Sequence, residues 1–223
     1  MIQSLSPGVY DRKQLEEEVF PQLLGQEVRR IHYSRCMKLI SRKLVLENLK
    51  HCNLRLTMGE DMNLILPCIL DARRLVVVEK GLYYHYRFVD ASLVHKYRPG
   101  LYEMIGLLYH TLEKLLSEKG FSEDTDSGKG RKLSEDWSRR LREEYLHLFF
   151  LVIKNELRGP AKGCAGRLQR MIRQEKAWKD LEDITITAEG KATRLLYAIW
   201  KNPGVGQVML GRAAVSVFDR VTG

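Results

Sequence analysis

The hydrophobic pattern changes at Pro99-Gly100, and this change constrains the fold most. Beyond it, apolar residues recur three and four positions apart, the spacing of a helix with one face in a core. The first stripe comprises Leu101, Ile105, Leu108, Leu112 and Leu115. The second follows Ser134, a predicted helix cap, and comprises Leu141, Tyr145, Leu148, Phe149 and Val152. Residues 100–223 are therefore predicted to form an all-α region.

This region should hold three further helices and one loop. Helical spacing continues over 165–180, 188–201 and 203–218, and Gly159-Pro160 ends the helix before them. Between the two stripes, residues 121–133 are rich in Glu, Asp, Ser, Gly and Lys. That composition predicts a flexible loop.

Residues 1–99 mix short strands with short helices. Leu75–Val78 is the clearest strand, because β-branched residues favour extended backbone, and Asn53–Thr57 is a second candidate. Met62–Ala72 has helical spacing, and Pro67 inside it requires local compensation for its missing donor. The predicted class is an α/β part with a few short strands, followed by an all-α region, so that the chain is predominantly helical.

Three helix starts in this part are marked by their residue types. Asp11 with Gln14 three positions later forms a capping-box pattern, and Ser41 is a second candidate cap. Glu60-Asp61 follows Gly59 and opens an apolar helix, where the helix dipole favours acidic groups. The simpler interpretation of this pair is helix capping, and the alternative is a general base facing a cleft.

Charge and composition restrict the class of protein. The chain has 37 Lys and Arg against 28 Asp and Glu, a net charge of +9 spread evenly along it. Such an excess suits either an anionic partner or a solvated basic surface. Apolar runs are too short to span a bilayer, no signal peptide is visible, and no cysteines form a CxxC pair, so a reduced, cytoplasmic protein is predicted.

Two further motifs contain residue types that bind phosphates, sugars or cations. Leu82–Arg87, followed by Ser92, is an aromatic and basic cluster in which Arg87 could grip a phosphate and tyrosines could stack on a sugar; edge-strand packing is the alternative. Asp124-Thr125-Asp126 has the spacing of a cation site, but it lies in a polar loop and not after an apolar strand. No metal site is predicted.

Several segments taken together resemble the C-terminal half of family 2 glycosyltransferases, the inverting bacterial enzymes that build surface polysaccharides. The resemblance covers about residues 7–98 and rests on the order of short motifs. These are Pro7-Gly8-Val9-Tyr10, Phe20-Pro21-Gln22-Leu23-Leu24, Lys38-Leu39 before Arg42-Lys43-Leu44, Gly59-Glu60-Asp61, Ala72–Val78, and Leu82–Arg87 with Ser92.

The resemblance implies part of a GT-A type core over residues 1–99 and transfer of a sugar from a nucleotide-sugar donor to a hydroxyl of a saccharide or lipid-linked acceptor. Asp61 matches the family's catalytic base. The matching substrate-side residues are Glu60, Lys38, His85, Tyr86, Arg87 and Ser92.

The family's nucleotide-binding N-terminal half has no counterpart in this sequence. The resemblance therefore implies no cofactor within the chain, and a Mg²⁺ or Mn²⁺ ion only where that half is present. It also predicts an exposed sheet edge that pairs with the other half or leads to self-association.

The positive charge of the chain raises two other functions. A nucleic-acid-binding module is disfavoured because the basic residues are not clustered and no known binding motif appears. A non-catalytic helical module on an acidic membrane surface, peripheral to the inner membrane, is the alternative to the enzyme. Its candidate basic stripe comprises Arg167, Arg170, Arg173 and Lys176.

Overall fold

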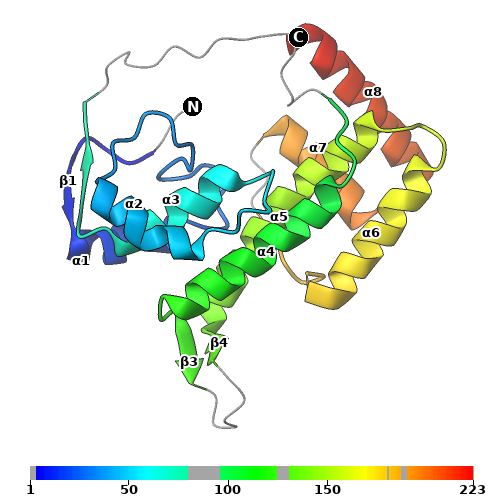
Figure 1. Cartoon of the computed structure of the whole chain (residues 1–223). Coiled ribbons are helices and arrows are strands. Elements are labelled where there is room, and N and C mark those ends of the chain that lie inside the picture. Colours follow the sequence, from blue (N-terminus) through cyan, green and yellow to red (C-terminus); the bar gives the residue numbers. More distant parts are fainter. Residues whose placement is uncertain (1–3, 80–95, 125–130, 180, 187–189, 223) are drawn as a thin grey trace. The chain divides into compact units, whose positions relative to one another are not determined.

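The computed structural model describes residues 4–79, 96–124, 131–179, 181–186 and 190–222. It is predominantly helical, as the sequence predicted (Figure 1). The chain forms two compact units, each built from two segments. Unit 1 comprises Met1–Tyr86 and Met104–Glu144, and unit 2 comprises Arg87–Glu103 and Tyr145–Gly223.

Unit 1 begins with a strand and a short composite helix. The elements up to α3 are β1 (Gly8–Asp11), α1 (Arg12–Gln14), a π-helical turn (Leu15–Val19), two 3₁₀ turns (Phe20–Gln22 and Leu49–His51), α2 (Arg42–Asn48) and α3 (Glu60–Asp71). The later ones are β2 (Arg74–Val77), most of α4 (Leu101–Glu118), β3 (Ser122–Asp124), β4 (Arg131–Leu133) and the start of α5 (Glu135–Arg158).

Two of the predicted caps, Asp11 and Ser41, are confirmed. The Asp11 carboxylate accepts from the Gln14 amide at 2.9 Å, and the Gln14 side chain accepts from the Asp11 amide at 3.0 Å. Ser41 Oγ accepts from the amide of Leu44 at 3.2 Å and starts α2. These bonds satisfy amides that have no partner within a first helical turn.

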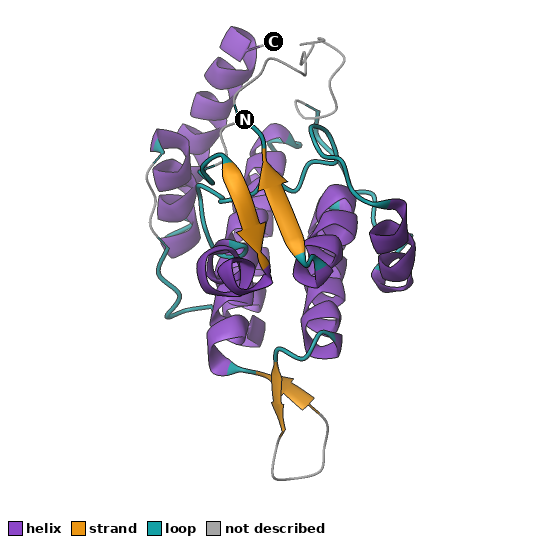
Figure 2. Ribbon diagram, turned by 90° about the vertical axis from the view of Figure 1, so that its left-hand side faces the viewer, coloured by secondary structure: helices purple, strands orange, loops and turns teal. Residues whose placement is uncertain are grey.

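The strands of the described residues form two small antiparallel pairs (Figure 2). β1 pairs with β2, with Gly8 opposite Val77 and Asp11 opposite Arg74, which confirms the strand predicted near residues 75–78. Val9 and Val76 are opposite each other in this register, and both are exposed. The pair therefore exposes two valines that lie opposite each other, next to the charged Asp11 and Arg74.

Two predictions for unit 1 are wrong. Asn53–Thr57 is not a strand but a turn, because the Asn53 side chain accepts from the amide of Arg55 at 3.1 Å and so offers the backbone a local alternative. Residues 121–133, predicted as a loop, contain β3 and β4 as a hairpin between α4 and α5. Phe121 anchors it against Trp137 at 4.3 Å between ring centroids, a contact that composition does not reveal.

The core of unit 1 joins its short elements to α4. Its fully buried apolar side chains come from the composite helix, α3 and α4, and they include Leu15, Leu23, Leu24, Ile65, Leu66, Ile105, Leu108, Leu112 and Leu116. The predicted stripe on α4 is thereby confirmed as its core-facing side.

Unit 2 consists of helices. Besides the remainder of α5 it contains α6 (Cys164–Lys179), α7 (Lys191–Lys201) and α8 (Val205–Thr222), close to the predicted ranges. Phe149 packs edge-to-face on the fully buried Trp200, with centroids 5.4 Å apart. This aromatic pair lies at the centre of the unit's core.

A buried polar cluster also lies in unit 2. The Glu175 carboxylate accepts from the hydroxyls of Tyr102 at 2.5 Å and Tyr145 at 2.8 Å, and from Lys179 Nζ at 2.6 Å. Burial, and then the hydrogen bond to this carboxylate, raise the pKa of Tyr102 above its usual value. The buried charges are thus paired and hydrogen-bonded, as burial requires.

Candidate functional site

The start of α3 places the candidate base. Gly59 precedes the helix with φ of +77°, a left-handed conformation that side chains other than glycine rarely adopt. A Cβ at this position would also lie 2.4 Å from Leu108 Cδ2. Glycine is therefore required here on two grounds, and the sharp turn it allows puts Glu60 and Asp61 in the first turn of α3.

Asp61 lies at the surface beside a guanidinium. Its side chain is 37% exposed, and its Oδ1 accepts from Arg35 Nε in an ion pair. Among the described residues, the structure gives Oδ2 no hydrogen-bond donor. The carboxylate of Asp61 is thus held through one of its two oxygens.

Lys38 adds a second cation near Asp61. Its ammonium donates to the carbonyl of Ser34 at 2.8 Å. Burial lowers the pKa of Lys38, and the negative charge of Asp61 partly opposes this shift. The charges of Asp61 and Lys38 are therefore coupled in the folded protein.

The backbone between Arg35 and Lys38 turns through an unusual conformation. Met37 has φ of +59°, and it is the one described residue other than glycine with positive φ. Met37 and Leu39 expose their apolar side chains on either side of Lys38, and Leu39 is fully exposed. Such backbone conformations cost about 1–3 kcal/mol and cluster at functional sites.

Glu60 shares the turn with Asp61 but not its surroundings. Its side chain is exposed, and among the described residues no ion pair or hydrogen bond is found for it. Of the three predicted residues before and within α3, the structure thus brings together Lys38 and Asp61 and leaves Glu60 exposed to solvent.

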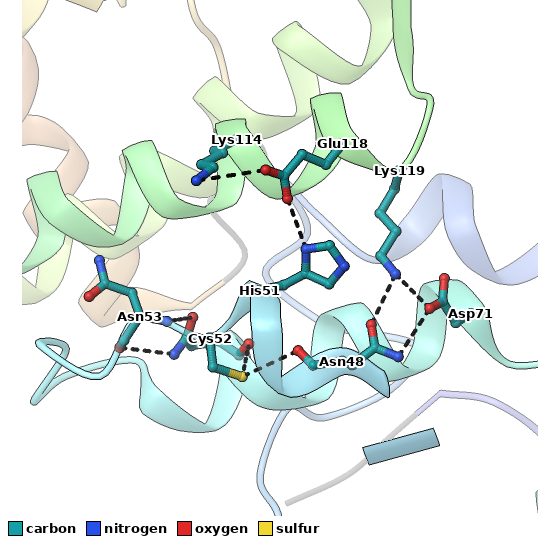
Figure 3. A network of polar contacts seen from close by, with 9 residues as sticks. Asn48, His51, Cys52, Asn53, Asp71, Lys114, Glu118 and Lys119 are labelled. Carbon is teal, nitrogen blue, oxygen red and sulfur yellow. Dashed lines mark hydrogen bonds and ion pairs between the residues drawn. The ribbon is translucent and has the colours of Figure 1, made fainter. Parts of the chain in front are cut away.

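A polar network within unit 1 fixes the C-terminal end of α3, the end opposite Asp61 (Figure 3). At the C-terminal end of α3, Asp71 accepts from Lys119 Nζ at 2.5 Å and from Asn48 Nδ2 at 3.0 Å. Burial by itself would raise the pKa of Asp71, but these hydrogen bonds and the charge of Lys119 outweigh it and lower the pKa. The helix is thereby tied to α2 and to the end of α4.

The same network compensates for the proline inside α3. Pro67 has no N–H for the carbonyl of Asn63, four residues earlier. The Cys52 thiol donates to that carbonyl instead, with 3.5 Å between sulfur and oxygen. The compensation that the sequence required for Pro67 is therefore present, and it comes from outside the helix.

Four predicted substrate-side residues lie outside the described residues: His85, Tyr86, Arg87 and Ser92. Of the Asp124-Thr125-Asp126 motif, only Asp124 is described, at the end of β3. Within the described part of the chain, no group of three or more His, Cys, Asp or Glu side chains could hold a metal ion.

Arg35 is the site residue that sequence reasoning missed. It lies in a segment without helical or strand periodicity, far from Asp61 in sequence, so no spacing rule connects the two. The available signal was its position beside Lys38 in the motif region of the resemblance. Only the folded backbone shows that Arg35 is the partner of Asp61.

In the described ranges no helix is both long and apolar enough to cross a membrane. No family model, curated protein or solved structure matches the chain. The function is therefore inferred from the chain's own residues and geometry.

Proposed function

We propose that this chain is the acceptor-side part of an inverting family 2 glycosyltransferase, with Asp61 as the general base. The observation that carries the proposal is the surroundings of Asp61. It lies in the first turn of α3, with its side chain partly exposed and one oxygen bound to Arg35. This geometry suits proton transfer to a carboxylate of fixed orientation.

The proposed reaction needs one proton acceptor on the acceptor side. Asp61 takes the proton of an acceptor hydroxyl while the hydroxyl oxygen attacks the anomeric carbon of the donor sugar. The bond from that carbon to the nucleoside diphosphate breaks, the diphosphate leaves with the electron pair, and the configuration inverts. Arg35 holds the carboxylate and cannot itself take up the proton, since a guanidinium stays protonated.

Positive charge also lies near the proposed base. Arg35 and Lys38 supply two cations beside Asp61, on the acceptor side of the reacting carbon, since the diphosphate of an inverting displacement leaves from the opposite face. Lys38 keeps its place through the Ser34 carbonyl. We assign Lys38 and Arg35 to the substrate side of the site, together with His85, Tyr86, Arg87 and Ser92.

The remaining parts of the proposal follow from the family resemblance. Nucleotide-sugar binding, and any Mg²⁺ or Mn²⁺ ion with it, is assigned to a donor-binding half and not to these residues. The exposed valines of β1 and β2 are compatible with a neighbouring protein surface. The acceptor is a saccharide or a lipid-linked saccharide, and the reaction takes place in the cytoplasm.

The test is a transfer assay on the protein as isolated from its source cells, with its intact mass recorded. Release of nucleoside diphosphate is measured over a panel of nucleotide sugars, with lipid-linked and soluble saccharide acceptors. Asp61→Asn should lower turnover by about 10²–10⁴-fold, the usual contribution of a general base. Circular dichroism and thermal unfolding should remain close to those of the wild type.

Glu60→Gln is the matched control, because the structure leaves this neighbouring carboxylate exposed and without an ion pair or hydrogen bond among the described residues, so the proposal assigns it no contact with substrate. It should retain turnover within about threefold of the wild type, since loss of one surface charge changes a screened field only slightly. Comparable activity in Asp61→Asn and wild type would refute the base assignment. A wild type that releases no diphosphate from any donor would refute the proposed reaction.

A further inference from the structure

α8 carries the most extensive exposed apolar surface on a single described helix. Val205, Met209, Leu210 and Val217 are each between 60% and 65% exposed. With the exposed Ala213 and Ala214 between them, they form what we call the α8 apolar face. Residues of this face recur three and four positions apart, so they lie on one side of the helix.

The opposite side of α8 is the one that packs within unit 2. Val208, Gly211 and Val215 are buried. A Cβ on Gly211 would lie 2.7 Å from Ile199 of α7 and 3.2 Å from Leu157 of α5. The rotation of α8 about its axis is therefore fixed by close packing, and the α8 apolar face is turned outward because of it.

No charged residue of α8 lies on this face between Val205 and Val217. Arg212 donates to the carbonyl of Gly159 at 2.9 Å, and Asp219 accepts two hydrogen bonds from Arg158. Arg220 is exposed on the same side as the face, three residues beyond Val217. Before α8, the exposed Lys201 is the last residue of α7, four residues ahead of Val205, and its ammonium lies over the ring of Tyr197, 5.4 Å from the centroid.

Charge decides which kind of partner suits this arrangement. The last two helices carry five Lys and Arg and one Asp, so their net charge is positive. Antiparallel pairing of α8 with a second copy would bring Arg220 toward Lys201 of that copy, and parallel pairing would set Arg220 against Arg220. Both pairings oppose like charges, whereas an anionic surface attracts both ends.

We infer that α8 docks on an anionic membrane surface, with its apolar face in the boundary between headgroups and acyl chains. An interfacial helix buries its apolar side by about 5–10 Å, and basic residues at its edges contact anionic headgroups. Lys201 and Arg220 fill this role at the two ends. The inference does not depend on the proposed reaction at Asp61.

The basic stripe that the sequence predicted for a membrane-binding module is only partly exposed in the structure. Arg167 on α6 is bound to Glu156 at 2.8 Å and to the carbonyls of Pro160 and Lys162. Lys176 lies over the ring of Trp200, 5.3 Å from its centroid. Only Arg170 and Arg173 of the predicted stripe are exposed, so α8 and its flanking cations carry the inference instead.

The experiment is co-sedimentation of the full chain with phosphatidylcholine vesicles, with and without about 30% phosphatidylglycerol. Wild type should pellet with the anionic vesicles and dissociate as salt rises. Met209→Gln with Leu210→Gln should weaken binding by about tenfold or more, because two exposed apolar side chains lose their burial in lipid. Lys201→Gln with Arg220→Gln should weaken it by about tenfold or more as well.

Leu39→Gln with Leu54→Gln is the matched control, since both side chains are almost completely exposed and lie in unit 1. This variant and Asp61→Asn should bind vesicles as the wild type does. The inference fails if the Met209 and Leu210 variant binds like the wild type. It also fails if wild type does not pellet, or if light scattering shows a dimer that the same variant dissolves, since a second copy then covers the face.

Discussion

At the scale of single residues, the site depends on charges that act on one another across the fold. Burial removes hydration from the Lys38 ammonium and lowers its pKa, while the carboxylate of Asp61 acts in the opposite direction. The carboxylate is also bound by Arg35. A change at Asp61 should therefore be measurable at Lys38 independently of any reaction.

Asp61→Asn should lower the pKa of Lys38 further. The substitution removes the negative charge that favours the ammonium and leaves the burial that disfavours it. NMR titration of the Lys38 side chain in wild type and variant would measure the shift, with Glu60→Gln as the control that leaves it nearly unchanged. An unchanged Lys38 pKa in Asp61→Asn would show that the two groups are not coupled.

At the scale of elements, α3 depends on the residue before it and on the loop beside it. Gly59 provides the left-handed turn and the space for Leu108. Cys52 supplies the donor that Pro67 lacks. The contacts of Gly59 and Cys52 involve residues outside α3, so the stability of this helix depends on the rest of unit 1.

Gly59→Ala should destabilise unit 1 by about 2–4 kcal/mol, from a strained φ and an overpacked contact with Leu108. Gly120→Ala is the control, because Gly120 has φ of +85° but nothing within 4 Å of an added Cβ. Its cost should be about 1 kcal/mol, from backbone strain alone. Denaturant unfolding of both variants measures the difference, and equal costs would contradict the clash.

In the molecule as a whole, each unit has a group of hydrogen bonds and ion pairs that joins its helices. Apolar contacts are not directional, so these polar contacts help to fix how the helices pack. In unit 1 Lys119, Asn48 and Asp71 join three helices. In unit 2 the Glu175 carboxylate accepts hydrogen bonds from the hydroxyls of Tyr102 and Tyr145 and from the ammonium of Lys179. The stability of unit 1 should consequently depend on pH through Asp71.

The pKa of Asp71 is lower in the folded protein than in the unfolded chain, where it is about 3.9. Its contribution to the free energy of unfolding is therefore complete above that value and is lost as pH falls through the folded pKa. Asp71→Asn should remove about 1–2 kcal/mol at pH 7, a figure reduced by the partial exposure of the carboxylate.

Thermal unfolding followed by circular dichroism from pH 7 to pH 2 measures this effect. The difference between wild type and Asp71→Asn should shrink as the solution becomes acidic, because protonated Asp71 resembles the amide. A constant difference over the whole range would show that the Lys119 pair contributes nothing that depends on the charge of Asp71.

Much of the fold follows from local pattern. Helical spacing located α4, α5 and α8, and residue types located the caps at Asp11 and Ser41, because these depend on neighbours within a turn or two. The hairpin of β3 and β4 was missed because polar composition does not reveal the contact between Phe121, just before β3, and Trp137, just after β4. Asn53 was misassigned because its side chain competes with strand pairing.

Composition and short periodic patterns predict the helical character of the chain, the position of Asp61 in a first helical turn, and the net positive charge. The folded backbone is needed to show that Arg35 pairs with Asp61, that the Cys52 thiol donates to a carbonyl of α3, and that α8 exposes its apolar face. The reason is that each of these features depends on packing between different elements. Local propensity reflects only neighbours along the chain and carries no information about such packing.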